Sequence, residues 1–171
     1  MSDTAMWTYT LGPNRTPIER FDILAPKPEH IYILDIAHGL AGIYRFQGQS
    51  PIRKTVAEHC IEVACCFEIS TEPRLFLWGL LHDAAEAYTG DHIRPHKHVT
   101  MLGNGSATDV EGNILSVLAA KVGVQSPSYT EWESIKYHDS RLGDEELVEL
   151  WDLSNGKPEW TTFHWEQEWM S

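Results

Sequence analysis

The chain has 171 residues, of which 42% are hydrophobic and 22% charged, a composition typical of one globular domain with a full core. Its formal net charge of -12 argues against a protein that grips nucleic acid electrostatically. No apolar stretch is long enough to span a bilayer, and the N-terminus lacks the basic and apolar regions of a secretory signal. We therefore expect a cytoplasmic single-domain protein with neither nucleic-acid nor membrane partners.

The first part of the chain predicts an arm followed by a helix. Residues 1–30 contain several prolines and are expected to form an irregular arm that lies on the body of the domain. A helix is expected from about 35 to 44, with Ile36, Leu40 and Ile43 on its apolar face. A loop over 46–51, which contains glycine and proline, follows it.

A capping box predicts the start of the next helix. Thr55 and Glu58 have the spacing of reciprocal caps, and apolar residues then repeat with helical period at 56, 60, 63 and 67. His59 falls on the same inward face. This helix also contains the cysteines at 60, 65 and 66, which we interpret as reduced thiols. A cysteine metal site is the alternative, although the spacing fits no common zinc pattern.

The segment from about 73 to 88 predicts the central buried helix, because residues 75–81 are apolar nearly all round. It carries the adjacent pair His82 and Asp83, followed by Glu86. On a continuous helix these three polar groups crowd one side. That arrangement suits a metal and a general acid or base better than core packing. The helix is expected to end near Gly90.

The last predicted helices follow a loop over 91–97 and a flexible stretch at 103–106. One helix carries apolar residues at 110, 114, 117 and 118. The other begins at a second capping box, Ser128 with Glu131, and places Trp132, Ile135, Asp139 and Leu142 on one stripe. Asp139 therefore faces inward. The sequence predicts an all-α bundle with polar sites on three separate helices.

The inward polar residues are two imidazoles and two carboxylates. Together they form a suitable ligand set for a divalent ion, which would lower the pKa of a coordinated water and polarise a phosphoryl oxygen. Each residue alone could be a hydrogen-bonded core group. The conjunction of His59, His82, Asp83 and Asp139 favours a metal.

The order of these residues resembles that of the HD-domain metal-dependent phosphohydrolases, over roughly residues 21–150. The segments 35–40, 45–46, 56–59 and 80–91 are similar to the small nucleotidase-like branch of that superfamily. This branch includes bacterial deoxynucleoside 5′-monophosphatases and phage-type deoxynucleoside triphosphate hydrolases. The resemblance implies a single compact HD-domain helical bundle over residues 1–171.

The resemblance also implies a role for each matching residue. The metal ligands would be His59, His82, Asp83 and Asp139, holding one divalent ion: zinc, cobalt or manganese, with magnesium as a further candidate. Acid/base and water-positioning carboxylates would be Glu86 and Asp91. Phosphate would contact Arg45 and Lys97, and Phe46 would lie beside the base or sugar.

The implied reaction is hydrolysis of the bond between the 5′ oxygen and the α-phosphorus of a deoxynucleotide. The short chain with its proline-rich arm favours a phage-type dNTP triphosphohydrolase, with dATP as a candidate substrate, acting in a host cytoplasm as a homo-oligomer. A deoxynucleoside 5′-monophosphatase is the alternative. A non-catalytic nucleotide or metal sensor on the same fold, and an all-α interaction module, are alternatives of other classes.

Several histidines and tryptophans have two open interpretations. His138 precedes Asp139, where the family usually has a small residue, and is either close to the metal ligands or exposed. The loop histidines at 92, 96 and 98 either touch phosphate or are solvated. The tail over 152–171, with the tryptophans at 151, 160, 165 and 169 in or beside it, is expected to pack on the domain or form a subunit contact; base stacking is the alternative.

Overall fold

The computed structural model describes residues 7–10, 19–91 and 107–150. The elements run in the order β1 (Trp7–Thr10), β2 (Glu19–Asp22), η1 (Pro28–His30), α1 (Ile33–Gly42), η2 (Arg45–Gly48), α2 (Val56–Cys65), α3 (Pro73–Leu81), α4 (Glu86–Thr89), α6 (Ala107–Val122) and α7 (Tyr129–Leu150). The fold is all-α apart from one short pair of strands, as predicted. No helix among these elements is long and apolar enough to cross a membrane.

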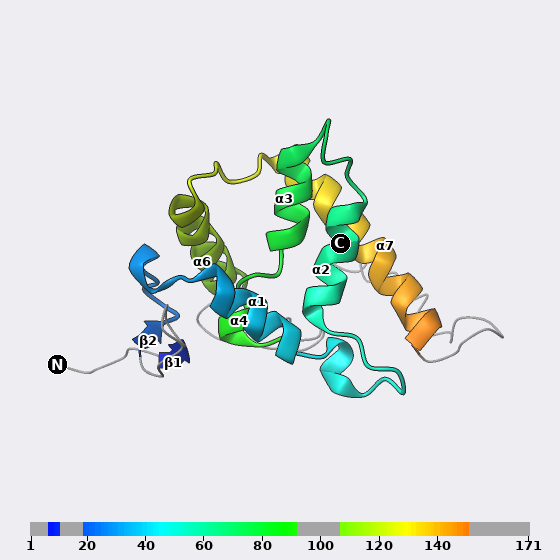
Figure 1. The fold of residues 1–171 in the computed structure, drawn as a ribbon, viewed down its shortest axis with the longest axis horizontal. Coiled ribbons are helices and arrows are strands. Elements are labelled where there is room, and N and C mark those ends of the chain that lie inside the picture. Colours follow the sequence, from blue (N-terminus) through cyan, green and yellow to red (C-terminus); the bar gives the residue numbers. More distant parts are fainter. Residues whose placement is uncertain (1–6, 11–18, 92–106, 151–171) are drawn as a thin grey trace, which may run out of the picture.

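Three helices, α2, α3 and α7, pack against one another, while α1 lies across the ends of α2 and α4 (Figure 1). The core between them is built from apolar side chains that are almost fully buried, among them Val56, Val63, Trp78, Leu118 and Ile135. Burial of such side chains is the main force that holds the helices together. The inner faces predicted from helical periodicity are the faces that pack.

Both predicted capping boxes are present. The Thr55 backbone N–H donates to Glu58 Oε2 at 2.7 Å, and the Glu58 N–H donates to Thr55 Oγ1 at 3.2 Å. At the start of α7 the corresponding distances are 2.7 Å for the Ser128 N–H to Glu131 Oε2 and 3.3 Å for the Glu131 N–H to Ser128 Oγ. These bonds satisfy N–H groups that have no partner within the helix.

The prediction of a single helix from 73 to 88 is wrong in one respect, because the structure has two helices there. Helix α3 ends at Leu81 and α4 begins at Glu86. Between them the Ala84 N–H donates to the Leu81 carbonyl at 3.0 Å and the Glu86 N–H to the Asp83 carbonyl at 2.9 Å. These bonds span three residues instead of four, so the chain is wound more tightly here. His82 and Asp83 therefore lie in a turn.

The N-terminal arm contains more order than the sequence predicts. Strands β1 and β2 pair antiparallel, with Thr8 opposite Phe21, where an irregular arm is expected. Phe21 is fully buried and stacks on Tyr88 of α4, with ring centroids 4.0 Å apart. Strand pairing and this aromatic contact offset the cost of ordering the arm.

Helices α2 and α3 approach closely at Gly79. A Cβ atom at this position would lie 2.9 Å from Ala64 Cα on α2, which is too close for two carbon atoms without a shift of the backbone. We expect Gly79→Ala to lower the free energy of unfolding by ~1–3 kcal/mol, the usual cost of overpacking. Urea unfolding monitored by circular dichroism measures this change.

A matched control is available in α6. Gly112 is exposed, and no described atom lies within 4 Å of the position its Cβ would take. Gly112→Ala should leave stability unchanged or raise it by up to about 1 kcal/mol, because alanine is the better helix former. Equal effects of the two substitutions would show that α2 and α3 do not depend on close contact at Gly79.

Candidate metal centre

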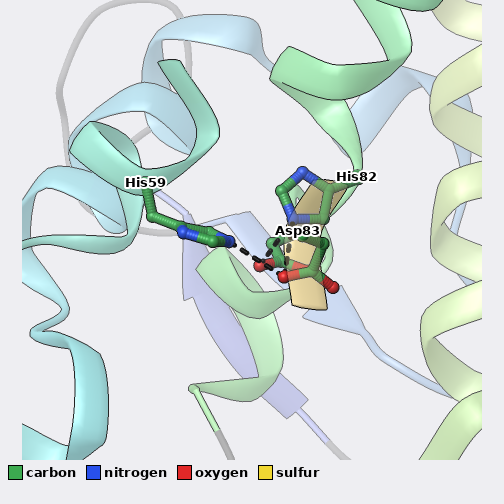
Figure 2. Close-up of side chains that lie close together, drawn as sticks. His59, His82 and Asp83 are labelled. Carbon is green, nitrogen blue, oxygen red and sulfur yellow. Dashed lines mark hydrogen bonds and ion pairs between the residues drawn. The ribbon is translucent and has the colours of Figure 1, made fainter. Parts of the chain in front are cut away.

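Four side chains that are far apart in the sequence meet between α2, the α3–α4 turn and α7. One ligand atom from each of His59, His82, Asp83 and Asp139 lies within 4.8 Å of the others. Figure 2 shows the two imidazole rings and Asp83 turned toward one another. Both histidine side chains are fully buried, and the two aspartates are 11% and 12% exposed. The structure thus brings together all four residues that the sequence predicts as metal ligands.

His82 is held by its own helix. Its Nδ1 atom lies 2.7 Å from the carbonyl oxygen of Gly79, so Nδ1–H donates this bond and Nε2 faces the cluster. Nε2 lies 3.1 Å from Asp83 Oδ2 and 3.8 Å from Asp139 Oδ1, yet no described atom meets it in hydrogen-bond geometry. A buried ring nitrogen that faces two carboxylates and has no hydrogen-bond partner is well placed to bind a cation.

His59 is held at both ring nitrogens by α7. Nε2 lies 3.0 Å from Asp139 Oδ1, and Nδ1 lies 2.7 Å from Glu146 Oε1. Burial favours the neutral imidazole, but the hydrogen bonds with Asp139 and Glu146 raise the pKa of His59 above its usual value. For His82 the negative charge of Asp83 likewise outweighs burial and raises the pKa well above the usual value. A metal ion would take the place of a proton at each ring, because only the neutral imidazole is a ligand.

The carboxylates use one oxygen toward the histidines and the other toward a lysine. Lys136 Nζ lies 2.9 Å from Asp139 Oδ2 and 3.9 Å from Asp83 Oδ1. Although burial works to raise the pKa of each carboxyl group, the hydrogen bond with His59 lowers that of Asp139, and the charge of His82 lowers that of Asp83. Both carboxylates are therefore ionised at neutral pH.

Glu146 is a buried residue that the sequence analysis missed. Its side chain is 2% exposed, and it pairs with Arg45 Nε at 3.1 Å and Lys54 Nζ at 3.3 Å as well as with His59. Burial would raise the pKa of Glu146, but the hydrogen bond from His59 and the charge of Arg45 lower it to about 2. The inward stripe at 132, 135, 139 and 142 has spacings of 3, 4 and 3 residues. One more step of four residues would have predicted Glu146.

Arg45 and Phe46 occupy a turn with an unusual backbone. Phe46 and Gln47 have φ values of 54° and 56°, in the left-handed region, and Gly48 follows at 69°. For the two residues that are not glycine this conformation costs roughly 1–2 kcal/mol each. The Arg45 N–H donates to the Lys54 carbonyl at 2.8 Å, which closes the loop and holds the turn. Arg45 Cζ lies 5.3 Å from the centroid of the Phe46 ring.

The remaining predicted site residues lie partly within and partly outside the described residues. Glu86 is buried at the start of α4, directly after the turn that carries His82 and Asp83. Asp91 is close enough to Arg45 that its charge contributes to raising the pKa of that guanidinium. Lys97, the loop histidines and the tryptophan-rich tail lie outside the described residues.

The second His-Asp pair is not equivalent to the first. His138 packs edge-on against Phe67, with ring centroids 5.1 Å apart, and it is not one of the four clustered residues. The ring is half-buried against this aromatic neighbour, so the interpretation of His138 as exposed is wrong, while a position beside the metal ligands stays a prediction. The cysteines are free thiols, and within the described parts of the chain none joins the candidate metal group.

The donor set fits a divalent cation. Imidazole nitrogens and carboxylate oxygens are ordinary ligands of divalent metals, and the buried Nε2 of His82 without a hydrogen-bond partner indicates a position where a cation would be favourable. The cluster could therefore hold a metal ion.

Comparison with known proteins assigns no family. A search against protein-family models finds no match. A protein of Rhodobacter capsulatus, described as uncharacterized, is 43% identical over 83 residues, which is 46% of this chain and 42% of that protein. The chain thus spans less than half the length of this relative, and the match carries no activity.

Proposed function

We propose that this protein is a metal-dependent phosphohydrolase of the HD type that acts on deoxynucleotides, in the first place as a dNTP triphosphohydrolase. The observation that carries the proposal is the meeting of His59, His82, Asp83 and Asp139. These residues come from three separated segments in the order that the HD phosphohydrolases have. A hydrogen-bonded core would not require two ionised carboxylates beside two buried imidazoles, since burying charge is costly.

The local charges support an anionic substrate despite the net charge of -12. Arg45, Lys54 and Lys136 all lie within 4 Å of carboxylates of the site. A divalent ion would add further positive charge at the centre of this group. Because pairs in a buried site are screened less than charges on the surface, these cations offset the carboxylates of the site, and the added charge of the ion would then attract an anionic substrate.

The reaction proposed is attack of water on the α-phosphorus, with cleavage of the bond to the 5′ oxygen. A bound metal would act as a Lewis acid toward the phosphoryl group. Glu86 is proposed to take a proton from the attacking water or return one to the leaving 5′ oxygen, and Asp91 to position the water. Arg45 would bind phosphate, with Phe46 beside the sugar or base and Lys97 as a second phosphate contact.

Product analysis tests this proposal. The purified protein is incubated with each dNTP and each dNMP in the presence of Mn²⁺, Co²⁺, Zn²⁺ or Mg²⁺. Nucleoside plus triphosphate is the expected product pair, and a chelator-treated sample is the control. Nucleoside plus phosphate from the monophosphates alone would identify a 5′-monophosphatase. Metal binding without any product would favour the non-catalytic sensor and refute the proposal that the protein is an enzyme.

Arg45→Lys is expected to lower kcat/KM by at least about tenfold, or about 1.4 kcal/mol of transition-state binding. A guanidinium can donate two parallel hydrogen bonds to a phosphate, which an ammonium cannot reproduce. Steady-state kinetics on the best substrate measures the effect. Arg53→Lys is the matched control, because Arg53 lies in the same loop but its guanidinium packs over Tyr44. If both variants keep wild-type kinetics, residues other than Arg45 must contact the phosphate.

A further inference from the structure

Glu146 connects two parts of the candidate site that the sequence treats as separate. It lies on α7, two helical turns after Asp139. Its Oε1 atom faces His59 Nδ1 at 2.7 Å, and its Oε2 atom faces Arg45 Nε at 3.1 Å. One carboxylate thus contacts both a candidate metal ligand and the candidate phosphate-binding arginine.

The contact with His59 determines which ring nitrogen is available to a metal. A carboxylate that is ionised can only accept hydrogen bonds, so His59 Nδ1 carries the proton that it donates to Glu146. The lone pair of the neutral ring is then on Nε2, the nitrogen that points to Asp139 and the cluster. Partners of this kind orient ligating histidines and strengthen metal binding in many proteins.

The contact with Arg45 determines where the guanidinium lies. Its Nε is occupied by Glu146, and within the described residues this is the hydrogen bond that its side chain makes. The guanidinium also lies against α7 at Gly143, where a Cβ atom would be 3.6 Å from Nη2. The two η nitrogens are therefore left to contact an anion, while the charge stays in the field of Asp83, Asp91 and Asp139.

We infer that Glu146 is a positioning residue that serves both groups at once: it orients His59 toward the metal position and holds the Arg45 guanidinium for an anionic group. The second half of this inference rests on the proposed function, whereas the first needs only a metal. Glutamine cannot replace Glu146 in both roles. It has one acceptor oxygen and an NH₂ group that donates, so it can accept from His59 or from Arg45 but not from both.

The test is a titration of metal-free protein with Co²⁺ or Zn²⁺, followed by calorimetry. We expect Glu146→Gln to weaken metal binding about 10–100-fold, the usual effect of removing a partner of a ligating histidine. Glu149→Gln is the matched control, because Glu149 loses the same charge on the same helix but is exposed. On metal-saturated protein, the affinity for inorganic phosphate should fall about tenfold in Glu146→Gln and stay unchanged in Glu149→Gln.

Equal metal affinity in the Glu146→Gln and Glu149→Gln proteins would overturn the first half of the inference. Equal phosphate affinity would overturn the second. If Glu146→Gln does not fold, as judged by circular dichroism, Glu146→Asp serves instead. It keeps the charge and both acceptor oxygens but is one methylene shorter, and weaker metal binding is again expected. A wild-type protein that binds metal but hydrolyses no deoxynucleotide would refute the proposed function and leave the metal titration valid.

Discussion

Replacing His82 by alanine is expected to remove stoichiometric divalent metal from the protein while the helical fold remains largely intact. The imidazole is fully buried, and its Nε2 is the ring atom that faces both aspartates. Without it, one of two nitrogen ligands is lost, and Asp83 and Asp139 lose their shared neighbour. Elemental analysis of the purified protein measures bound metal, and circular dichroism measures helical content.

His138→Ala is the matched control for this substitution. His138 also precedes an aspartate, but its ring packs on Phe67 instead of joining the four-residue cluster. Metal content should therefore stay at the wild-type level in His138→Ala. Full metal occupancy in the His82→Ala protein would refute the assignment of the cluster as the metal centre.

Replacing Glu86 by glutamine is expected to lower turnover by roughly 10²-fold or more, the usual scale for a positioned acid or base, while metal content is unchanged. Glu86 is 3% exposed, so glutamine preserves the packing that alanine would disturb. It begins α4, directly after the turn that carries His82 and Asp83. Proton transfer beside the cluster is the role we propose for its carboxyl group, which is not one of the four clustered ligands.

Single-turnover and steady-state kinetics on metal-saturated protein measure this effect. Glu133→Gln, on the exposed face of α7, controls for the loss of one negative charge and should keep wild-type turnover. If turnover falls less than about threefold in Glu86→Gln while metal stays bound, Glu86 takes no part in catalysis. Loss of metal together with loss of turnover would instead make it a ligand.

The positions of His59 and Asp139 are determined by local sequence. Each follows a capping box that fixes where its helix begins, and each falls on an apolar stripe with helical period. A helix buries its apolar stripe to remove it from water, so the polar residues on that stripe are carried inward with it. This is why two ligands of the candidate site could be predicted without any knowledge of their partners.

The turn at His82 and Asp83 is evident only in the structure. The apolar run that precedes it predicts a continuous helix, on which adjacent residues point about 100° apart. In the structure, bonds that span three residues and the contact of His82 Nδ1 with the Gly79 carbonyl wind the chain more tightly. In the structure the side chains of both His82 and Asp83 contribute to the same group of four residues. No spacing rule in the sequence predicts where a helix will tighten in this way.

The role of Glu146 also required the tertiary structure. Its partners His59 and Arg45 lie 87 and 101 residues away in the sequence, and helical period indicates only that it faces inward. A buried carboxylate is stable only where cations and donors from other elements meet it, and that meeting depends on how α2, η2 and α7 pack. The sequence by itself therefore determined most of the helices and the four inward polar residues of the cluster, whereas packing decided how those residues combine with Glu146 and Arg45.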